Sequence, residues 1–343
     1  MARGDLLKRL FLSYLRQNDD AFRSAAMEII AEEQKKNHPL LADELQRILS
    51  NNIVNSTMVK PRYDLSSLPK DRERQALLVE IRKAERYLPD IILSKKNQKT
   101  IEEMMEEFRR SEILRSHGIN RRTKLLFCGP PGCGKTLLAE VIAAELGLPI
   151  LYTRFDAIVS SYLGETSANL RKVFDYATRG TWVVFFDEFD AIGKSRDDLT
   201  EHGELKRVIN SFLQLLDRFR GESLIIAATN HEHLLDAALW RRFDEIMRLA
   251  RPSVKDIQVL LTKKLASMPH PQIKPEAIAS ALKGLSHAEV ERICYHAIRL
   301  CVLGDFSEVT SELFEESVER EKQRLGIVRT ADKRIKNSVK ESR

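Results

Sequence analysis

Two short stretches of the chain combine residue types and spacings that suit phosphate chemistry. The first, GPPGCGKT at 129–136, fits the pattern G-x-x-x-x-G-K-[ST], follows an apolar run and opens a helical run. Glycines let backbone N–H groups curl around phosphate oxygens, and the N-terminus of the following helix favours negative charge. The stretch therefore predicts a phosphate-binding loop, because its flanking pattern disfavours a glycine-rich turn without a ligand.

Two side chains of this loop have specific expected roles. Lys135 is expected to reach the β- and γ-phosphates of a nucleoside triphosphate, and the Thr136 hydroxyl is expected to bind Mg²⁺. The other residues expected to bind the nucleotide are the rest of the loop and the next helical residue: Gly129, Pro130, Pro131, Gly132, Cys133, Gly134 and Leu137.

The second stretch, VVFFDEFD at 183–190, places two carboxylates directly after four apolar residues. The apolar run predicts a buried strand, and ligands bind at the C-terminal ends of strands in sheets of this kind. Asp187 is expected to hold Mg²⁺, and Glu188 is expected to orient and polarise the attacking water. Paired acids after a strand can also cap a helix, but the phosphate-binding loop earlier in the chain favours the catalytic interpretation.

Three further residues are candidates for the same chemistry. Asn230 ends the apolar run IIAATN, where an amide can hydrogen-bond a γ-phosphate or the lytic water. Arg241 and Arg242 follow a short helical pattern, and an arginine that neutralises the developing charge contributes strongly to phosphoryl transfer. A turn asparagine and two surface arginines are the simpler alternatives, and from these residues alone they are favoured.

The elements that must position these residues alternate between strands and helices. Near-continuous apolar runs at 123–128, 149–153, 181–186, 223–228 and 245–249 alternate with helical patterns. Runs of this kind are typical of a parallel sheet that is buried on both faces, so the expected fold class is α/β. The expected large nucleotide-binding domain covers 85–252.

The flanking segments read differently. Residues 253–326 are helical in pattern, and Ser253 with Asp256 and Ser286 with Glu289 have the spacing of capping boxes at two helix starts. The other expected parts are a helical adaptor module at 1–52 with three amphipathic stripes, a polar linker at 53–84, and a basic flexible tail at 327–343.

Composition sets outer limits on the class of protein. The 343 residues are 43% hydrophobic and 31% charged, which is typical of a globular protein with roughly two domains and an appendage. The net charge of +6 permits an anionic partner. Nucleic acid is not the expected partner, because no DNA-binding helix pair, zinc pattern or aromatic–basic strand is found.

Cysteine usage and hydropathy bear on the compartment. The four cysteines form no CxxC pair and no metal-ligand pattern with histidines, which favours a reducing, intracellular setting. The N-terminus lacks a signal-peptide core, and no run approaches 18 apolar residues. A cytoplasmic protein without a membrane span of its own is therefore expected.

The ordered set GPPGCGKT, YLGET, FFDEFD, AATN and ALWRRFD resembles the AAA-clade AAA+ ATPases, the group that includes katanin, spastin and the membrane-anchored AAA proteases. The match covers about residues 85–325. The resemblance implies a P-loop AAA+ module with a five-stranded parallel sheet in the order 5-1-4-3-2, a C-terminal helical lid and a small N-terminal helical module. It also implies ATP hydrolysis with Mg²⁺ and a homo-oligomeric ring, most often a hexamer.

The resemblance also assigns roles to residues. Asn230 takes the place of the sensor residue, and Arg241 and Arg242 fall where the family carries arginine fingers that act on the nucleotide of a neighbouring subunit. The family's RPGRFD is shortened here to WRRFD, so which arginine is the main finger stays open. Of the Gly-Ala pair that contacts nucleotide from the lid, only Ala288 matches, and the role of His287 stays open.

An aromatic–hydrophobic–glycine triplet stands between two of the expected strands, at Tyr162, Leu163 and Gly164. In the AAA clade such a triplet forms the first pore loop, and Gly164 would permit a tight turn before the next helix. An aromatic side chain on such a loop can hold an extended polypeptide without reading its sequence. The alternative is that Tyr162 packs beneath the next helix.

These features predict an ATP-hydrolysing ring motor that remodels, unfolds or disassembles protein substrates by threading them through a central pore. Residues 3–50 are expected to dock a protein substrate or partner. No HExxH pattern follows the ATPase motifs, so a protease would be a separate chain. The alternatives are a nucleic-acid-associated loader or helper ATPase and a scaffold that hardly turns over.

Overall fold

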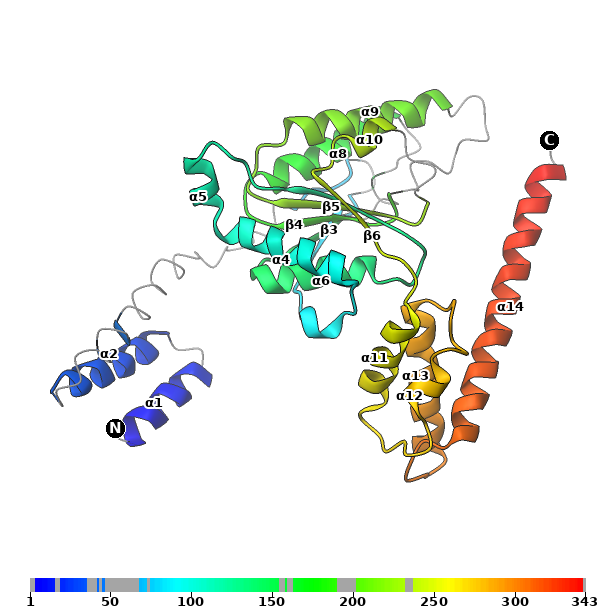
Figure 1. Ribbon diagram of the computed structural model, residues 1–343. Coiled ribbons are helices and arrows are strands. Elements are labelled where there is room, and N and C mark those ends of the chain that lie inside the picture. Colours follow the sequence, from blue (N-terminus) through cyan, green and yellow to red (C-terminus); the bar gives the residue numbers. More distant parts are fainter. Residues whose placement is uncertain are drawn as a thin grey trace. The chain divides into compact units, whose positions relative to one another are not determined.

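The computed structural model describes residues 4–15, 19–35, 42, 45–46, 68–72, 75–153, 158, 163–189, 202–231 and 237–341. The chain divides into two compact units, Met1–Leu65 and Ser66–Arg343 (Figure 1). Each unit has its own packing and is described by itself.

Among the described residues of the first unit, α1 (Gly4–Leu15) and α2 (Asp19–Lys35) pack against each other. Leu6 of α1 and Ala25 of α2 are buried, and Arg9 forms an ion pair with Glu28 at 3.0 Å. These helices match the first two amphipathic stripes in the sequence. The third stripe, at 41–49, falls largely outside the described residues.

The second unit is built on a six-stranded sheet. Its strands are β1 (Val79–Arg82), β2 (Lys124–Cys128), β3 (Ile150–Thr153), β4 (Val183–Phe186), β5 (Leu224–Thr229) and β6 (Glu245–Arg248). Their order across the sheet is β1-β3-β4-β5-β2-β6, with β2 to β6 parallel to one another. Counted along the chain, these five parallel strands stand in the order 5-1-4-3-2, as the resemblance implies.

The prediction of a five-stranded sheet was one strand short. β1 pairs antiparallel with β3, with Val79 opposite Thr153 and Arg82 opposite Ile150. It lies inside the segment 53–84 that the sequence marked as a linker. Only a partner strand far along the chain makes so short a segment extended, so a local pattern could not reveal it.

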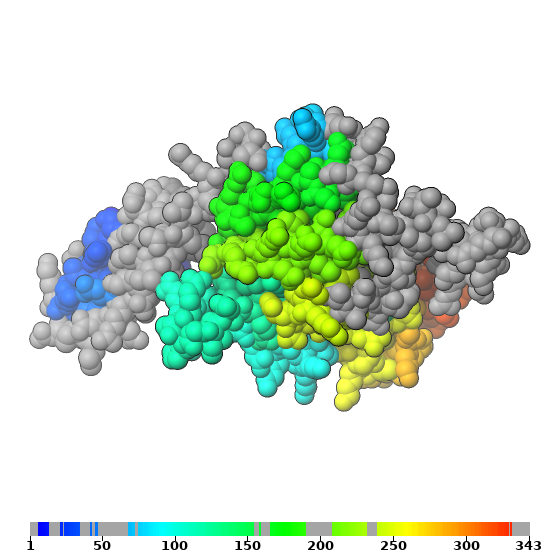
Figure 2. All heavy atoms as spheres, turned by 90° about the horizontal axis from the view of Figure 1, so that it is seen from above, coloured from blue at the N-terminus to red at the C-terminus, as the bar shows by residue number. Residues whose placement is uncertain are grey.

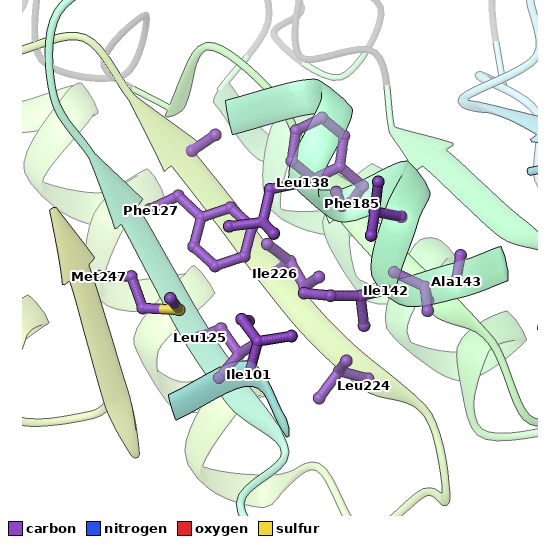
Figure 3. Close-up of a cluster of buried hydrophobic side chains, with 14 of the residues drawn as sticks. Ile101, Leu125, Phe127, Leu138, Ile142, Ala143, Phe185, Leu224, Ile226 and Met247 are labelled. Atoms are coloured by element: carbon purple, nitrogen blue, oxygen red, sulfur yellow. The ribbon is translucent and has the colours of Figure 1, made fainter. Parts of the chain in front are cut away.

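Helices cover both faces of the sheet (Figure 1). One face packs against α4 (Lys95–Arg109), which α5 (Ser111–Ser116) follows, and α6 (Lys135–Leu146). In Figure 3, Leu138 and Ile142 of α6 lie over Phe127 and Ile226 of the sheet. Two shorter elements also belong to the second unit, the 3₁₀ helix η2 (Leu88–Asp90) and α10 (Ala237–Trp240).

The other face packs against α8 (Leu163–Ala177) and α9 (His202–Arg218) through aromatic rings. The ring centroid of Phe174 lies 5.6 Å from that of Phe186, and Phe212 lies 5.2 Å from Phe186. Offset and edge-on aromatic pairs of this kind add to the free energy gained by burial. Helix α8 is thereby fixed to strand β4.

Residues 253–326, called the lid below, bury a separate core. The lid contains α11 (Val254–Leu265), α12 (Pro275–Ile278), α13 (His287–Leu303) and the first half of α14 (Ser311–Glu341). Ser253 and Ser286 are N-caps with complete capping boxes, so both predicted helix starts are confirmed.

The segment 327–343, expected to be a basic flexible tail, is helical in its described part. Helix α14 continues through it as far as Glu341. The physical reason is that no glycine or proline follows Gly326, and lysine, arginine and alanine favour the helix.

Two further expectations concern membranes and thiols. In the described part of the chain, no helix is long and apolar enough to cross a membrane. The four cysteines, Cys128, Cys133, Cys294 and Cys301, are all buried and reduced.

Candidate functional site

The phosphate-binding loop joins β2 to α6, and three of its glycines have positive φ. The angles are +140° at Gly129, +73° at Gly132 and +89° at Gly134, and residues other than glycine rarely adopt such angles. A Cβ atom at Gly129 would also clash with the Leu249 carbonyl at the end of β6. The sequence pattern is therefore enforced by both conformation and space.

Lys135 is the first residue of α6, and its side chain is held inside the curve of the loop. Only 7% of the residue is exposed, and its Nζ donates to the carbonyl oxygens of Gly129 at 2.8 Å and Pro130 at 3.0 Å. A buried ammonium is stabilised by nearby negative charge. The loop therefore suits an anionic ligand such as a phosphate.

Asp187 follows β4 directly, and three donors fix its carboxylate. Oδ2 accepts hydrogen bonds from Thr136 Oγ1 at 3.0 Å and from Tyr152 Oη at 3.1 Å. Oδ1 accepts from the backbone N–H of Glu188 at 2.8 Å. Two predicted site residues, Thr136 and Asp187, are thus brought together from segments that are distant in the chain.

This pair fits Mg²⁺. Hydroxyl and carboxylate oxygens are the ligands that Mg²⁺ prefers, and Mg²⁺ commonly takes one or two protein ligands together with substrate phosphates and water. No group of three or more His, Cys, Asp and Glu side chains with metal-ligand spacing occurs among the described residues. When bound at Thr136 and Asp187, Mg²⁺ would neutralise charge on the phosphates.

The sequence did not identify Tyr152 as a residue of the site. Burial, followed by the negative charge of Asp187, raises the pKa of Tyr152 to about 12, so its hydroxyl remains a donor at neutral pH. The one available signal was a polar tip at the end of ILYT, a strand that is otherwise largely buried. That signal gains meaning only when β3 is known to lie beside β4.

Glu188 lies exposed just beyond the strand, in an unusual backbone conformation. Its φ of +49° is in the left-handed region, where a non-glycine residue costs on the order of 1 to 3 kcal/mol. The next residue, Phe189, is buried, with its ring centroid 4.7 Å from that of Phe212. This anchored ring holds the turn, so Glu188 presents its carboxylate at the end of β4.

Asn230 follows β5 at the same edge of the sheet. In the register of the parallel strands, Cys128 is opposite Thr229, so Gly129 and Asn230 leave β2 and β5 at the same level. The Thr229 hydroxyl accepts from the backbone N–H of His231 at 3.0 Å, which shapes the turn there. The loop, the acidic pair and the amide therefore follow three adjacent strands, where open α/β sheets bind ligands.

The two arginines follow α10. Arg241 is exposed, and Arg242 is half-buried with its Nε 3.4 Å from Asp217 Oδ2 on α9. An arginine that serves another subunit must be accessible at the surface. Arg241 meets that condition and forms no ion pair within the described part of the chain.

The lid reaches the phosphate-binding loop through the start of α13. The backbone N–H of Ala288 donates to the Gly132 carbonyl at 3.1 Å. His287 and Cys133 line a cavity of about 70 Å³ together with Asn97 and Asp256. Burial lowers the pKa of His287. A group bound at the loop would thus lie close to the lid.

The triplet predicted as a pore loop is only partly described. Tyr162 lies outside the described residues. Leu163 is the first residue of α8, and Gly164 lies within that helix rather than in a turn before it.

A phosphate-binding loop after β2, an acidic pair after β4, which is separated from β2 by β5, and a helical lid in contact with the loop define the class of P-loop nucleotide hydrolases. The family model described as "ATPase family associated with various cellular activities (AAA)" matches residues 125–251. A protein of Sinorhizobium fredii described as an uncharacterized AAA family ATPase is 43% identical over 332 residues, which are 96% of this chain and 99% of that protein.

Two other relatives are longer. ATP-dependent zinc metalloprotease FtsH 3 of Sphaerobacter thermophilus is 32% identical over 255 residues, 73% of this chain and 52% of that protein. Proteasome-activating nucleotidase of Methanosphaerula palustris is 32% identical over 263 residues, 74% of this chain and 64% of that protein. The chain belongs to the AAA ATPase family, and it is an ATP-binding, ATP-hydrolysing enzyme of the AAA clade.

Proposed function

We propose that this ATPase is a ring-shaped motor that remodels, unfolds or disassembles protein substrates by threading them through a central pore. The observation that carries the proposal is the attachment of α8 to the catalytic strand. Helix α8 begins within the triplet Tyr162, Leu163 and Gly164, and Phe174 of the same helix stacks on Phe186, the residue before Asp187. A change at the acidic pair would therefore be transmitted to the triplet.

In the proposed hydrolytic site, the loop backbone and Lys135 bind the phosphates of ATP, and Thr136 and Asp187 hold Mg²⁺. Glu188 orients the attacking water and accepts its proton, and Asn230 hydrogen-bonds the γ-phosphate or that water. Ala288 contacts the nucleotide from the lid. The hydrogen bond from Thr136 to Asp187 at 3.0 Å supports this arrangement.

The proposed assembly is a homo-oligomeric ring, most often a hexamer in this clade. Arg241 and Arg242 act as arginine fingers on the nucleotide of the neighbouring subunit, and the exposure of Arg241 favours it as the main finger. Two relatives carry names that connect them with protein breakdown, a metalloprotease and a proteasome-activating nucleotidase. Those names favour a protein substrate here, with a separate protease as a candidate partner and 3–50 as the docking module.

The experiment uses Glu188→Gln, which is expected to bind ATP and stall before hydrolysis. The variant would be isolated from its native cells with ATP, alone and together with Tyr162→Ala, and the co-purifying molecules identified. Threading predicts that specific proteins are held and that Tyr162→Ala releases them. Tyr295→Ala, which removes an exposed aromatic side chain from α13, is the matched control and should retain them.

Two outcomes contradict the proposal. If both Tyr162→Ala and Tyr295→Ala leave the retained proteins unchanged, the triplet does not hold the substrate. If nucleic acid is retained instead, and its retention falls steeply with salt, the loader or helper function replaces the motor.

A further inference from the structure

The segment that precedes the large α/β part contacts two elements of the ATPase. Residues 68–72 and 75–82, called the strap below, fold back on themselves, with the backbone N–H of Asp71 donating to the Ala76 carbonyl at 2.9 Å. The end of the strap is β1, which pairs with β3. Figure 2 shows the start of the strap in light blue against α8 in green.

The contact with α8 is buried and polar. Asn169 Nδ2 donates to Asp71 Oδ2 at 2.7 Å, and the two residues are 1% and 3% exposed. Lys172 Nζ donates to the Lys70 carbonyl at 2.9 Å. Because a buried carboxylate is costly when it loses its partner, this contact fixes the strap to the helix that begins in the Tyr162 triplet.

The contact with β3 leads to the catalytic carboxylate. The Arg82 guanidinium lies 3.8 Å from the centre of the Tyr152 ring, and its Nη2 is 2.9 Å from Glu80 Oε2. The hydroxyl of the same tyrosine donates to Asp187 Oδ2 at 3.1 Å. A continuous series of contacts therefore runs from β1 to Asp187.

Strand register explains why Tyr152 reaches Asp187. Tyr152 is opposite Phe185 in the parallel pair of β3 and β4, and their ring centroids are 5.7 Å apart. Asp187 comes two residues after Phe185 and so lies on the same face as the tyrosine. With Thr136 as the second donor to Oδ2, rotation of the carboxylate is restricted.

We propose that Tyr152 is a positioning residue for Asp187, and that Arg82 of the strap holds the tyrosine ring in place for that task. The strap, which follows the first unit along the chain, then connects α8 with the carboxylate that holds Mg²⁺. The inference rests on the proposed role of Asp187, but it does not depend on threading of a polypeptide.

The test removes the hydroxyl alone, with Tyr152→Phe. Two quantities are measured: the Mg²⁺ concentration that gives half-maximal binding of a fluorescent ADP analogue, and kcat against KM for ATP. Loss of a hydrogen bond to a charged group predicts a roughly tenfold rise in that Mg²⁺ concentration and a similar fall in kcat. Binding of the analogue in EDTA and KM for ATP should change less than about twofold by the same argument.

Two controls frame this result. Tyr295→Phe removes a tyrosine hydroxyl from α13 in the lid and should match wild type. Asp187→Asn sets the size of a full loss of Mg²⁺ dependence. If Asp187→Asn leaves Mg²⁺ dependence intact, the assignment of Asp187 is wrong. If only Asp187→Asn has an effect and a folded Tyr152→Phe equals wild type, positioning by Tyr152 is overturned.

The role of Arg82 is tested by a double-mutant cycle. Arg82→Gln is expected to raise the same Mg²⁺ concentration roughly threefold, and Arg82→Lys, which keeps a cation over the ring, to restore most of it. Combined with Tyr152→Phe, Arg82→Gln should add nothing, because Arg82 acts through the hydroxyl. Additive effects, or an effect of Arg82→Gln without one of Tyr152→Phe, would overturn the link.

Discussion

The α/β part and the lid differ in how far apart along the chain their defining contacts lie. In the lid, α11 and α13 each begin at a serine, Ser253 or Ser286, whose hydroxyl accepts from a backbone N–H three residues later. In the α/β part, Asp187 is held by Thr136, which lies 51 residues away, and by Tyr152. The lid helices are specified by local spacing, whereas the site is assembled from distant segments.

The same difference appears in the glycines. Gly129 and Gly284 both have positive φ, at +140° and +95°. An added Cβ atom would meet the backbone of Leu249 at Gly129, whereas at Gly284 it would meet no described residue within 4 Å apart from its chain neighbours. A long-range contact thus adds a steric requirement to a conformational one in the α/β part. Side chains can move aside more easily than backbone, so this requirement is strict.

The largest expected effect comes from alanine at these two positions. Gly129→Ala should lower the free energy of unfolding by about 3 kcal/mol or abolish nucleotide binding, because strain and the clash with Leu249 act together. Gly284→Ala should cost only about 1 kcal/mol, from the left-handed conformation alone. Denaturant unfolding and nucleotide binding measure both. Equal effects at the two positions would break the contrast between the two regions.

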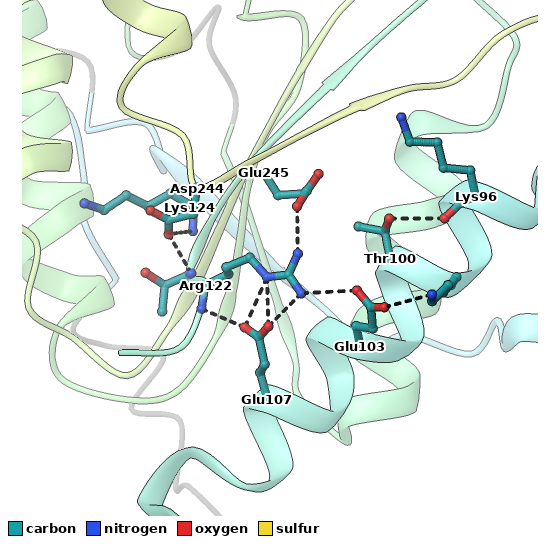
Figure 4. Close-up of polar contacts among 10 residues, drawn as sticks. Lys96, Thr100, Glu103, Glu107, Arg122, Lys124, Asp244 and Glu245 are labelled. Carbon is teal, nitrogen blue, oxygen red and sulfur yellow. Dashed lines mark hydrogen bonds and ion pairs between the residues drawn. The ribbon is translucent and has the colours of Figure 1, made fainter. Parts of the chain in front are cut away.

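A second comparison uses ion pairs. Arg122 Nη2 lies 2.6 Å from Glu107 of α4, and its Nη1 lies 2.7 Å from Glu245 of β6, so one side chain joins separate elements (Figure 4). In the lid, Lys264 pairs with Glu291 between two helices. Because Arg122 and its partners are about one quarter exposed, Arg122→Gln should cost about 2 kcal/mol after allowing for solvent screening. Lys264→Gln should cost less than about 1 kcal/mol, since it removes one pair.

The pH dependence of the unfolding free energy tests the ion pair of Arg122 with Glu107 further. Burial opposes the charged form of Glu107, but the hydrogen bonds from Arg122 outweigh it and hold the pKa of Glu107 below its usual value. A carboxyl with a lowered pKa stabilises the fold above its unfolded value of about 4.3 and loses that contribution as the pH falls through the folded value. The difference in unfolding free energy between wild type and Arg122→Gln should therefore shrink below about pH 4. A constant difference would show that the ion pair is not its cause.

The range of a contact also explains what the sequence could predict. The phosphate-binding loop, both capping boxes and the five parallel strands follow from local patterns, and their order follows from the resemblance. Asp187 and Thr136 were predicted as separate motif residues, and their hydrogen bond at 3.0 Å brings them together.

The features that were missed depend on neighbours across the sheet. β1 is extended because β3 provides a partner, and Tyr152 reaches Asp187 because β3 lies beside β4. Neither relation is encoded in spacing along the chain. The left-handed conformation of Glu188 was also unforeseen, because it depends on the turn that Phe189 anchors through its packing on Phe212.

The N-cap of α11 tests whether the lid helices are specified by local spacing. Ser253→Ala removes the N-cap of α11 and should cost about 1 kcal/mol of unfolding free energy, because the backbone N–H of Asp256 loses its acceptor. Ser307→Ala, in the exposed loop before α14, is the control and should be nearly neutral. If the lid is specified locally, Ser253→Ala should leave Mg²⁺-dependent nucleotide binding almost unchanged. A loss of nucleotide binding similar to that of Gly129→Ala would show that this cap serves the site as well.

The smallest expected effect lies where the two regions meet. His287 begins α13, and its Nδ1 is buried with no hydrogen-bond partner among the described residues. Burial lowers the pKa of His287, and the nearby Asp256 opposes that shift only in part. Since the folded state disfavours the charged ring, the unfolded chain binds more protons below its pKa of about 6.5. Wild type should therefore lose stability as the pH falls below that value, and His287→Gln should lose less.

Thermal unfolding at pH 7.5 and at pH 5.5 would measure this difference for wild type, His287→Gln and the control His117→Gln, which replaces an exposed histidine at the end of α5. The difference in melting temperature between wild type and His287→Gln should narrow at the lower pH, because only wild type must place a charge on a buried ring or unfold. The same narrowing should occur with saturating nucleotide if the lid stays packed on the loop through the contact of Ala288 with Gly132. A narrowing that disappears with nucleotide would instead mean that His287 becomes solvent-exposed when the loop is filled, and that the lid, although locally specified, moves with the site.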